Sequence, residues 1–421
     1  MSQQKPSLRI HSVDNETTPL IQDLESSRPD HNRSDSGYAL HPSTPTNAES
    51  FKHFFFSSYL NLLLVAVPLS FLSHFLKWGS TSDFIISFIA IIPLASLLGD
   101  ATEQVALKVG STLGGLMNAT FGNAVEAIVG IVALQQNQLR IVQTSMLGSI
   151  LSNILLVLGC SFIGAGFKFK ESRFQATAAQ ASASLMLLAC IALVIPAAYY
   201  TTTVDRLTGP GKDLTATLPH DAAQHGLLVI SRGTSVLLLA MYILYLYFQL
   251  KTHTYLYQEE ASDGPEEEAT MNLKSASAAL VLVTVITAFC AEYLVDSIDE
   301  FATSAGIPKA FIGLILLPIV GNAAEHATSV WMAMKGKMEL AIGVAVGSSI
   351  QIAVGVIPIM VIIGWITGKP LTLYFENFET ICLVFSVLLT TLLIQDGKSN
   401  YMEGAMLVSL YVIIALAFWV S

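Results

Sequence analysis

Two short segments of the chain carry nearly the same polar residues inside apolar surroundings. GNAVEAIVG spans residues 122–130, and GNAAEHATS spans residues 321–329. Each holds an asparagine followed three residues later by a glutamate, so both side chains project from one helical face. An ionisable side chain inside an apolar run is costly, and such residues mark ion or substrate sites. Glu126 and Glu325 are therefore the first candidates for a binding site.

The chemistry of these motifs suits a hard cation. Gly and Asn are poor helix formers, so each motif predicts a helix break that frees backbone carbonyl groups. Ca²⁺ binds about six to eight oxygen ligands, and the two motifs together offer nearly that number. The side chains concerned are Glu126, Glu325, Asn123 and Asn322. Two neighbouring carboxylates cannot both stay ionised without a cation, so the pair would bind a divalent cation or protons. The alternative is an interhelical hydrogen bond between protonated acids.

Residues beside the motifs are candidates for supporting roles. Ser149, Ser348 and Gln351 follow in the next helices, where we expect them to add oxygens or to orient the carboxylates. His326 comes directly after Glu325 and so points off its face. It is either a proton relay, a residue that tunes the pKa of Glu325, or a packed histidine bonded to a neighbouring helix.

Glu103 and Glu292 also correspond across the two halves, because Ala101-Thr-Glu103 resembles Cys290-Ala-Glu292. Both fall near the predicted ends of helices. We expect either a proton pathway or vestibule at these positions, or two solvated helix ends.

Composition indicates the class of protein that must position these residues. Hydrophobic residues make up 53% of the 421 residues and charged residues 12%, with a mean hydropathy of +0.60. Soluble domains carry about 25% charged residues. Apolar runs long enough to span a bilayer recur from residue 55 onward, which predicts an all-α polytopic membrane protein. No basic cluster supports nucleic-acid binding, and the four cysteines show no zinc or disulfide pattern.

The hydropathy pattern predicts about eleven transmembrane helices. They fall at 55–76, 83–107, 113–135, 140–164, 174–199, 227–250, 273–298, 310–334, 339–366, 377–394 and 402–420. The polar segment 1–54 is predicted to be a disordered cytosolic tail. The remaining divisions are an extra helix (55–76), a first repeat (83–250), an acidic cytosolic linker (251–272) and a second repeat (273–420).

The two repeats are expected to have opposite orientations in the membrane. Three aligned pairs share one constant spacing: Asn123 with Asn322, Glu126 with Glu325, and Ser149 with Ser348. Helices 2–6 form the first half and helices 7–11 the second. Because five is an odd number of membrane crossings, the second half begins on the opposite side of the membrane from the first. Inverted repeats recur in secondary transporters, with the ion site at the midplane. Lys and Arg in the connections favour a cytosolic N-terminus.

The two motifs resemble those of the cation/proton exchanger (CAX) family, within the cation/calcium antiporter superfamily, and most resemble the vacuolar calcium/proton exchangers of fungi. The resemblance covers about residues 55–420, although Ala127 stands where the family often has Leu. It implies alternating-access transport of calcium, with manganese as a second cargo, into an acidic vacuole in exchange for protons. It also implies Glu126 and Glu325 as cation and proton ligands, with Asn123 and Asn322 beside them. No cofactor other than the transported ions is expected, and the oligomeric state stays open.

Three other functions compete with this interpretation. A sodium/calcium exchanger also duplicates an acidic motif, but lacks the Glu-His pair. An integral-membrane metalloenzyme would need a ligand set such as H-E-x-x-H, which the chain does not contain, so we expect no enzyme activity. A cation channel can use acidic rings, but inverted repeats with broken helices favour alternating access. The acidic linker resembles the family's acidic helix, and its alternative is a solvated charged loop.

Overall fold

The computed structural model describes residues 58–208, 217–256 and 270–420, together with Ser50, Lys52, Phe54 and Phe55. Most of the predicted tail (1–54) and all the acidic side chains of the predicted linker (251–272) lie outside these ranges.

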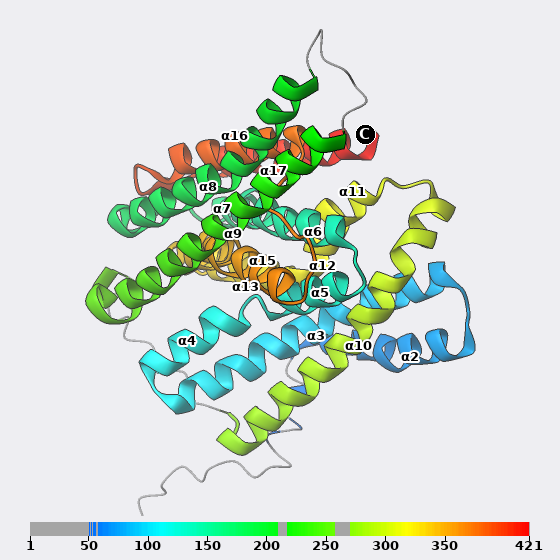
Figure 1. The fold of residues 1–421 in the computed structure, drawn as a ribbon. Helices are drawn as coiled ribbons and strands as arrows, with labels where there is room; N and C mark the ends of the chain where they lie inside the picture. Colours follow the sequence, from blue (N-terminus) through cyan, green and yellow to red (C-terminus); the bar gives the residue numbers. More distant parts are fainter. Residues whose placement is uncertain are drawn as a thin grey trace, which may run out of the picture. The chain divides into compact units, whose positions relative to one another are not determined.

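Within the described residues the protein is almost entirely helical (Figure 1). Nine helices are long and apolar enough to cross a membrane, and two bent helix pairs add one span each. This agrees with the predicted fold of about eleven transmembrane helices.

The first six spans, in chain order, are η1 (Tyr59–Val65) with α2 (Ala66–Leu76), α3 (Ser80–Val109), α4 (Ser111–Phe121) with α5 (Ala124–Gln135), α6 (Leu139–Leu151) with η2 (Ser152–Val157) and α7 (Leu158–Gly166), α8 (Ala176–Thr208), and α9 (Thr217–Tyr247) with η3 (Phe248–Thr252). The last five are α10 (Leu273–Ala305), α11 (Lys309–Phe311) with η5 (Ile312–Leu316), α12 (Leu317–Gly321) and α13 (Ala323–Met334), α14 (Met338–Gln351) with η6 (Ile352–Val356) and α15 (Ile357–Ile366), α16 (Asn377–Ile394), and α17 (Tyr401–Val420).

The two motifs lie at the bends of the two broken spans. α4 and α5 are bent by 48°, and the helices on either side of Asn322 by 56°. Asn123 (φ −106°, ψ 31°) and Asn322 (φ −89°, ψ 11°) leave helical geometry at these points. Glu126 and Glu325 consequently fall in the first turns of α5 and α13. The predicted helix breaks are therefore confirmed.

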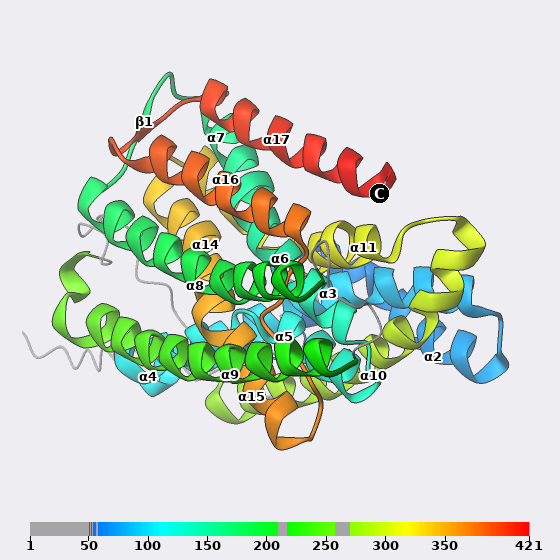
Figure 2. The same cartoon turned by 45° about the horizontal axis from the view of Figure 1, so that its top comes forward.

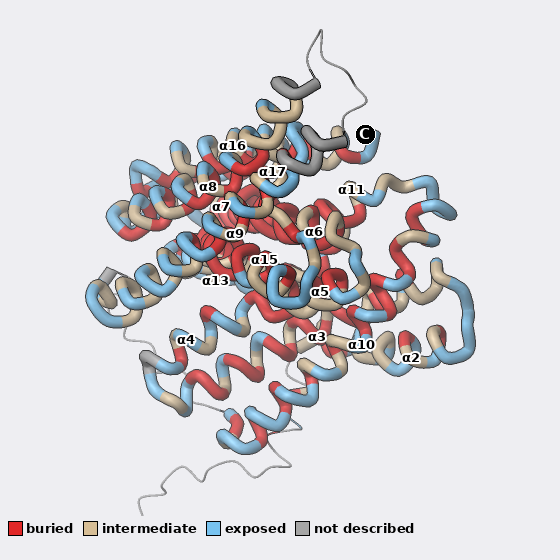
Figure 3. The backbone as a smooth tube through the Cα atoms, in the orientation of Figure 1, coloured by how far each residue is buried: buried red, intermediate tan, exposed pale blue. Residues whose placement is uncertain are grey.

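The spans that follow the motifs form the centre of the protein. Among the nine unbroken spans, α6–η2–α7 and α14–η6–α15 are the most enclosed, with 83% and 61% of their most apolar window buried. Figure 3 shows this concentration of buried backbone around α5, α6 and α7. Each of the two spans contains a π-helical segment, η2 or η6, at the corresponding place. Such wide turns are frequent at functional sites.

Other helices surround this centre. α3 and α10, the first helices of the two repeats, make the most extensive helix contact among the described residues (Figure 1). α16 packs against α8 (Figure 2). Strands β1 (Ser172–Arg173) and β2 (Lys398–Ser399) form a small antiparallel sheet that the sequence did not predict.

The predicted end of one helix is wrong in a way that affects a candidate residue. α10 continues to Ala305, beyond the predicted end at residue 298, so Glu292 lies well inside the helix. The acidic residues near residue 298 lower the local hydropathy, but Phe301 and Ala302 continue the buried face of the helix. The predicted connection 200–226 is also shorter than expected, because α8 continues to Thr208 and α9 begins at Thr217.

Candidate functional site

The two motifs bring their glutamates next to serines of the central spans. Ser149 Oγ on α6 lies 3.3 Å from Glu126 Oε1, and Ser348 Oγ on α14 lies 2.6 Å from Glu325 Oε1. The first pair lies within the first repeat and the second pair within the second repeat, and the two residues of each pair are equally far apart in the sequence. The two halves therefore build the same local contact.

The same serines also contact the asparagine of the opposite repeat. Ser348 Oγ is 2.8 Å from Asn123 Oδ1, and Ser149 Oγ is 3.1 Å from the amide of Asn322. Both asparagines are buried. Each serine thus links the glutamate of its own repeat to the asparagine of the other, and these contacts follow the symmetry of the repeats.

Asn322 connects the two carboxylates directly. Its amide nitrogen, turned toward the acids because the oxygen would otherwise face only acceptors, is 2.5 Å from Glu126 Oε1 and 3.3 Å from Glu325 Oε2. Gly321 makes this approach possible, since a Cβ there would lie 2.9 Å from Glu126 Oε1. The two glutamates therefore share one site between the repeats.

Two further amides surround the asparagines. Asn123 Nδ2 donates to Gln351 Oε1 at 2.7 Å. The amide of Asn153, in η2, lies 3.2 Å from that of Asn322. Asn153 is fully buried and was not predicted. The signal available in the sequence was an amide side chain in the middle of an otherwise apolar span.

His326 contacts the helix break rather than a carboxylate. Its Nδ1 donates to the backbone oxygen of Asn322 at 2.7 Å. Its Nε2 is buried and finds no hydrogen-bond partner among the described residues. The histidine therefore lies one step away from the shared carboxylate site.

Glu103 and Glu292 lie outside this hydrogen-bonded cluster. Both side chains are exposed, on α3 and α10 respectively. The structure thus brings together eight of the ten candidate residues, counting His326 through its contact with Asn322, and leaves these two on the surfaces of their helices.

A cavity of about 20 Å³ adjoins Glu126 on one side, which is room for about one water molecule. Its polar lining comes from Glu126, Ser145 and Ser149, and the rest of its wall is mainly apolar, including Ile91 and Leu294. Its lining includes Val129, one turn after Glu126 on α5, and Ser145, one turn before Ser149 on α6, so the cavity extends toward the end where α5 ends and α6 begins.

The donor atoms define what the site can bind. The described residues contain no group of three or more His, Cys, Asp or Glu side chains that could hold a metal. The cluster offers two carboxylates together with amide and hydroxyl oxygens. Oxygen donors of this kind suit hard cations such as Ca²⁺ and Mn²⁺, and the carboxylates also accept protons.

Comparisons with known proteins extend over both halves of the chain. A model of the family described as sodium/calcium exchanger protein matches residues 80–251 and 275–420. A vacuolar calcium ion transporter of Schizosaccharomyces pombe is 46% identical over 365 residues, covering 86% of this chain and 85% of that protein. A Ca²⁺/H⁺ antiporter of Aphanothece halophytica is 41% identical over 370 residues, covering 85% of this chain and 95% of that protein. The solved structure of native YfkE has a TM-score of 0.71 at 35% identity, covering 86% of this chain and 100% of that one.

Proposed function

Because the chain belongs to the sodium/calcium exchanger protein family, we propose that it exchanges calcium for protons across a membrane by secondary active transport. The family match covers both repeats, and the resemblance to cation/proton exchangers is confirmed. A relative that is named a Ca²⁺/H⁺ antiporter supports the proposed ions.

The observation that carries this proposal is the contact of one amide with two glutamates. Asn322 Nδ2 reaches both Glu126 and Glu325, so the carboxylates are close enough to bind one cation together. Without a cation, two neighbouring carboxylates cannot both stay ionised, so at least one of them takes up a proton or the two share one. Calcium and protons then occupy the same oxygens in turn, which couples their movements in opposite directions.

Alternating access is the proposed mechanism of movement. Inverted repeats with broken helices around a central site are typical of secondary transporters. The cavity beside Glu126 lies toward the end where α6 begins and has room for about one water molecule. In the orientation predicted from Lys and Arg, with the N-terminus in the cytosol, this side is lumenal.

The proposed location is the vacuolar membrane, since a fungal relative is named a vacuolar calcium ion transporter. Manganese is a second proposed cargo, because carboxylate and carbonyl oxygens are suitable ligands for both manganese and calcium. The ligands are proposed to be Glu126 and Glu325 with Asn123 and Asn322. No enzyme activity and no cofactor are part of the proposal.

Transport by the full chain in sealed vesicles tests the coupling ion. With an acidic lumen and no sodium, we expect calcium uptake together with a rise in lumenal pH. Collapsing the proton gradient should stop the uphill part of this uptake. No uptake under this proton gradient, but uptake when a sodium gradient is imposed instead, would replace the proposal with sodium/calcium exchange. Uptake that merely equilibrates calcium would indicate a channel.

A further inference from the structure

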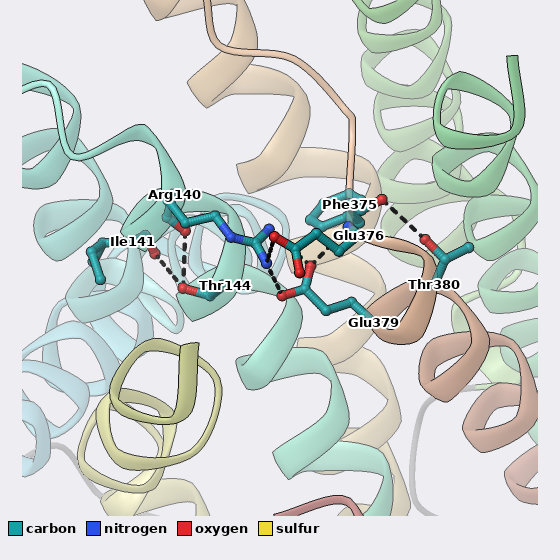
Figure 4. Close-up of polar contacts among 7 residues, drawn as sticks. All are labelled: Arg140, Ile141, Thr144, Phe375, Glu376, Glu379 and Thr380. Atoms are coloured by element: carbon teal, nitrogen blue, oxygen red, sulfur yellow. Dashed lines mark hydrogen bonds and ion pairs between the residues drawn. The ribbon is translucent and has the colours of Figure 1, made fainter. Parts of the chain in front are cut away.

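A buried ion pair outside the site joins the two repeats. The guanidinium of Arg140, at the start of α6, donates to Glu379 Oε2 at 3.0 Å and to Oε1 at 2.5 Å. Arg140 Nη2 also lies 2.9 Å from Glu376 Oε1 (Figure 4). The Glu379 side chain is 0% exposed, whereas that of Arg140 is 34% exposed. Arg140 therefore supplies the charge that balances a carboxylate enclosed by protein.

Glu379 is fixed from a second direction as well. Its Oε2 accepts the backbone N–H of Glu376 at 3.1 Å, as part of a capping box at the start of α16. A planar guanidinium that contacts both oxygens of a carboxylate defines distance and direction, which a single point charge does not. The first turn of α6 is thus held in one place relative to α16.

α6 transmits this position toward the ion site. Ser149 lies on the same helix as Arg140, about 13 Å further along at 1.5 Å per residue. Next to it, Gly148 packs so closely on η5 that a Cβ there would collide with the carbonyl oxygen of Leu314. A helix held at its start and packed this closely leaves its serine little freedom to shift along the axis.

We propose that Arg140 is a positioning residue for ion exchange. Its ion pair with Glu379 sets the position of α6 so that Ser149 contacts Glu126 and Asn322 together. No contact joins Arg140 to the two glutamates of the site, so its effect passes through Ser149. This inference rests on the proposed function, because its test uses calcium exchange.

The test compares variants that keep the protein folded. Removing Arg140 alone would leave a buried charge, whereas replacing both members of a buried pair by apolar residues is often tolerated. The double variant R140L/E379L is therefore reconstituted into vesicles and compared with Arg140→Lys. This second variant keeps the positive charge but loses the bidentate contact with Glu379. Arg173→Gln, which breaks an exposed ion pair with Glu171, is the control. Calcium uptake is measured against calcium concentration, and Ca²⁺-dependent stabilisation against heat reports binding separately.

For R140L/E379L we expect the half-saturating calcium concentration to rise about tenfold, because the hydrogen bond between Ser149 and Glu126 is lost. Loss of a hydrogen bond to a charged group has an effect of this size. Arg140→Lys should shift it less in the same direction, and Arg173→Gln should not shift it. In a Ser149→Ala background, the pair removal should add almost nothing, because both changes act on one contact. Unchanged affinity in a folded R140L/E379L protein, or equal shifts with and without Ser149, would overturn the inference. A wild type that ignores the proton gradient would instead overturn the proposed function.

Discussion

The amide nitrogen of Asn322 lies 2.5 Å from Glu126 Oε1, although the two residues belong to opposite repeats of the chain. The same nitrogen is 3.3 Å from Glu325 Oε2. Since one donor reaches both acids, an ion that binds one glutamate alters the surroundings of the other. Small displacements of either carboxylate should therefore disturb exchange as a whole.

Gly321→Ala tests how close the repeats must approach. The new Cβ would lie 2.9 Å from Glu126 Oε1 and push the carboxylate away. We expect the rate of calcium exchange at low calcium to fall about tenfold or more, because small misplacements at a site are costly. Gly343→Ala, on α14, is the control, since its Cβ would meet nothing within 4 Å. Equal activity in the two variants would contradict the close approach.

Ser348→Ala removes the 2.6 Å hydrogen bond to Glu325. We expect about a tenfold rise in the calcium concentration for half-maximal uptake, typical for a lost hydrogen bond to a charged group. The neighbouring Ser349→Ala should have little effect, because that hydroxyl donates to the backbone oxygens of Ala345, at 2.9 Å, and Ile150, at 3.4 Å, and not to a glutamate. Uptake curves of the two variants measured in parallel separate these cases, and a Ser348→Ala curve identical to wild type would refute the role of Ser348.

Asn153→Leu tests the residue that only the structure places near the site. The change removes the amide beside Asn322 while keeping a branched side chain with the same number of heavy atoms. We expect weaker calcium exchange from a normally folded protein. Ile352→Leu, at the aligned position of the second repeat, should leave exchange near the wild-type level, because volume-conserving apolar changes are well tolerated. Normal exchange in Asn153→Leu would contradict a contribution of Asn153 to the site.

His326→Ala should have a milder effect than the loss of either glutamate. Among the described residues, the imidazole contacts the site through the backbone oxygen of Asn322. We therefore expect uphill uptake to persist with a lower maximal rate or a changed preference between calcium and manganese, measured by competition. Complete loss of exchange with retained folding would instead make His326 an essential ion or proton carrier.

The sequence was sufficient to predict the symmetric part of the site. Glu126 and Glu325 could be found because the same costly group recurs at one spacing with the same neighbours. The symmetry also predicted their serine and asparagine partners. Asn153 could not be found this way, because Ile352 occupies its aligned position in the second repeat. An amide with no counterpart resembles any buried polar residue until its neighbours are known.

Contacts between distant helix ends could not be predicted from the sequence either. Arg140 and Glu379 each stand at the start of a predicted helix, where charged residues are usually solvated. Only the packing of α6 against α16 shows that this glutamate is enclosed. Similarly, the end of α10 depended on Phe301 and Ala302 packing inside the protein, which local hydropathy does not reveal.

The most direct measurement follows calcium uptake and lumenal pH together in acidic vesicles that contain the full chain. Wild type, Glu126→Gln and Glu325→Gln are compared, with Glu339→Gln, an exposed acid at the start of α14, as the control. We expect wild type and control to accumulate calcium uphill as the lumen becomes alkaline, and both site variants to lose both signals. Uphill uptake with proton counterflow in either site variant would contradict a shared two-carboxylate site.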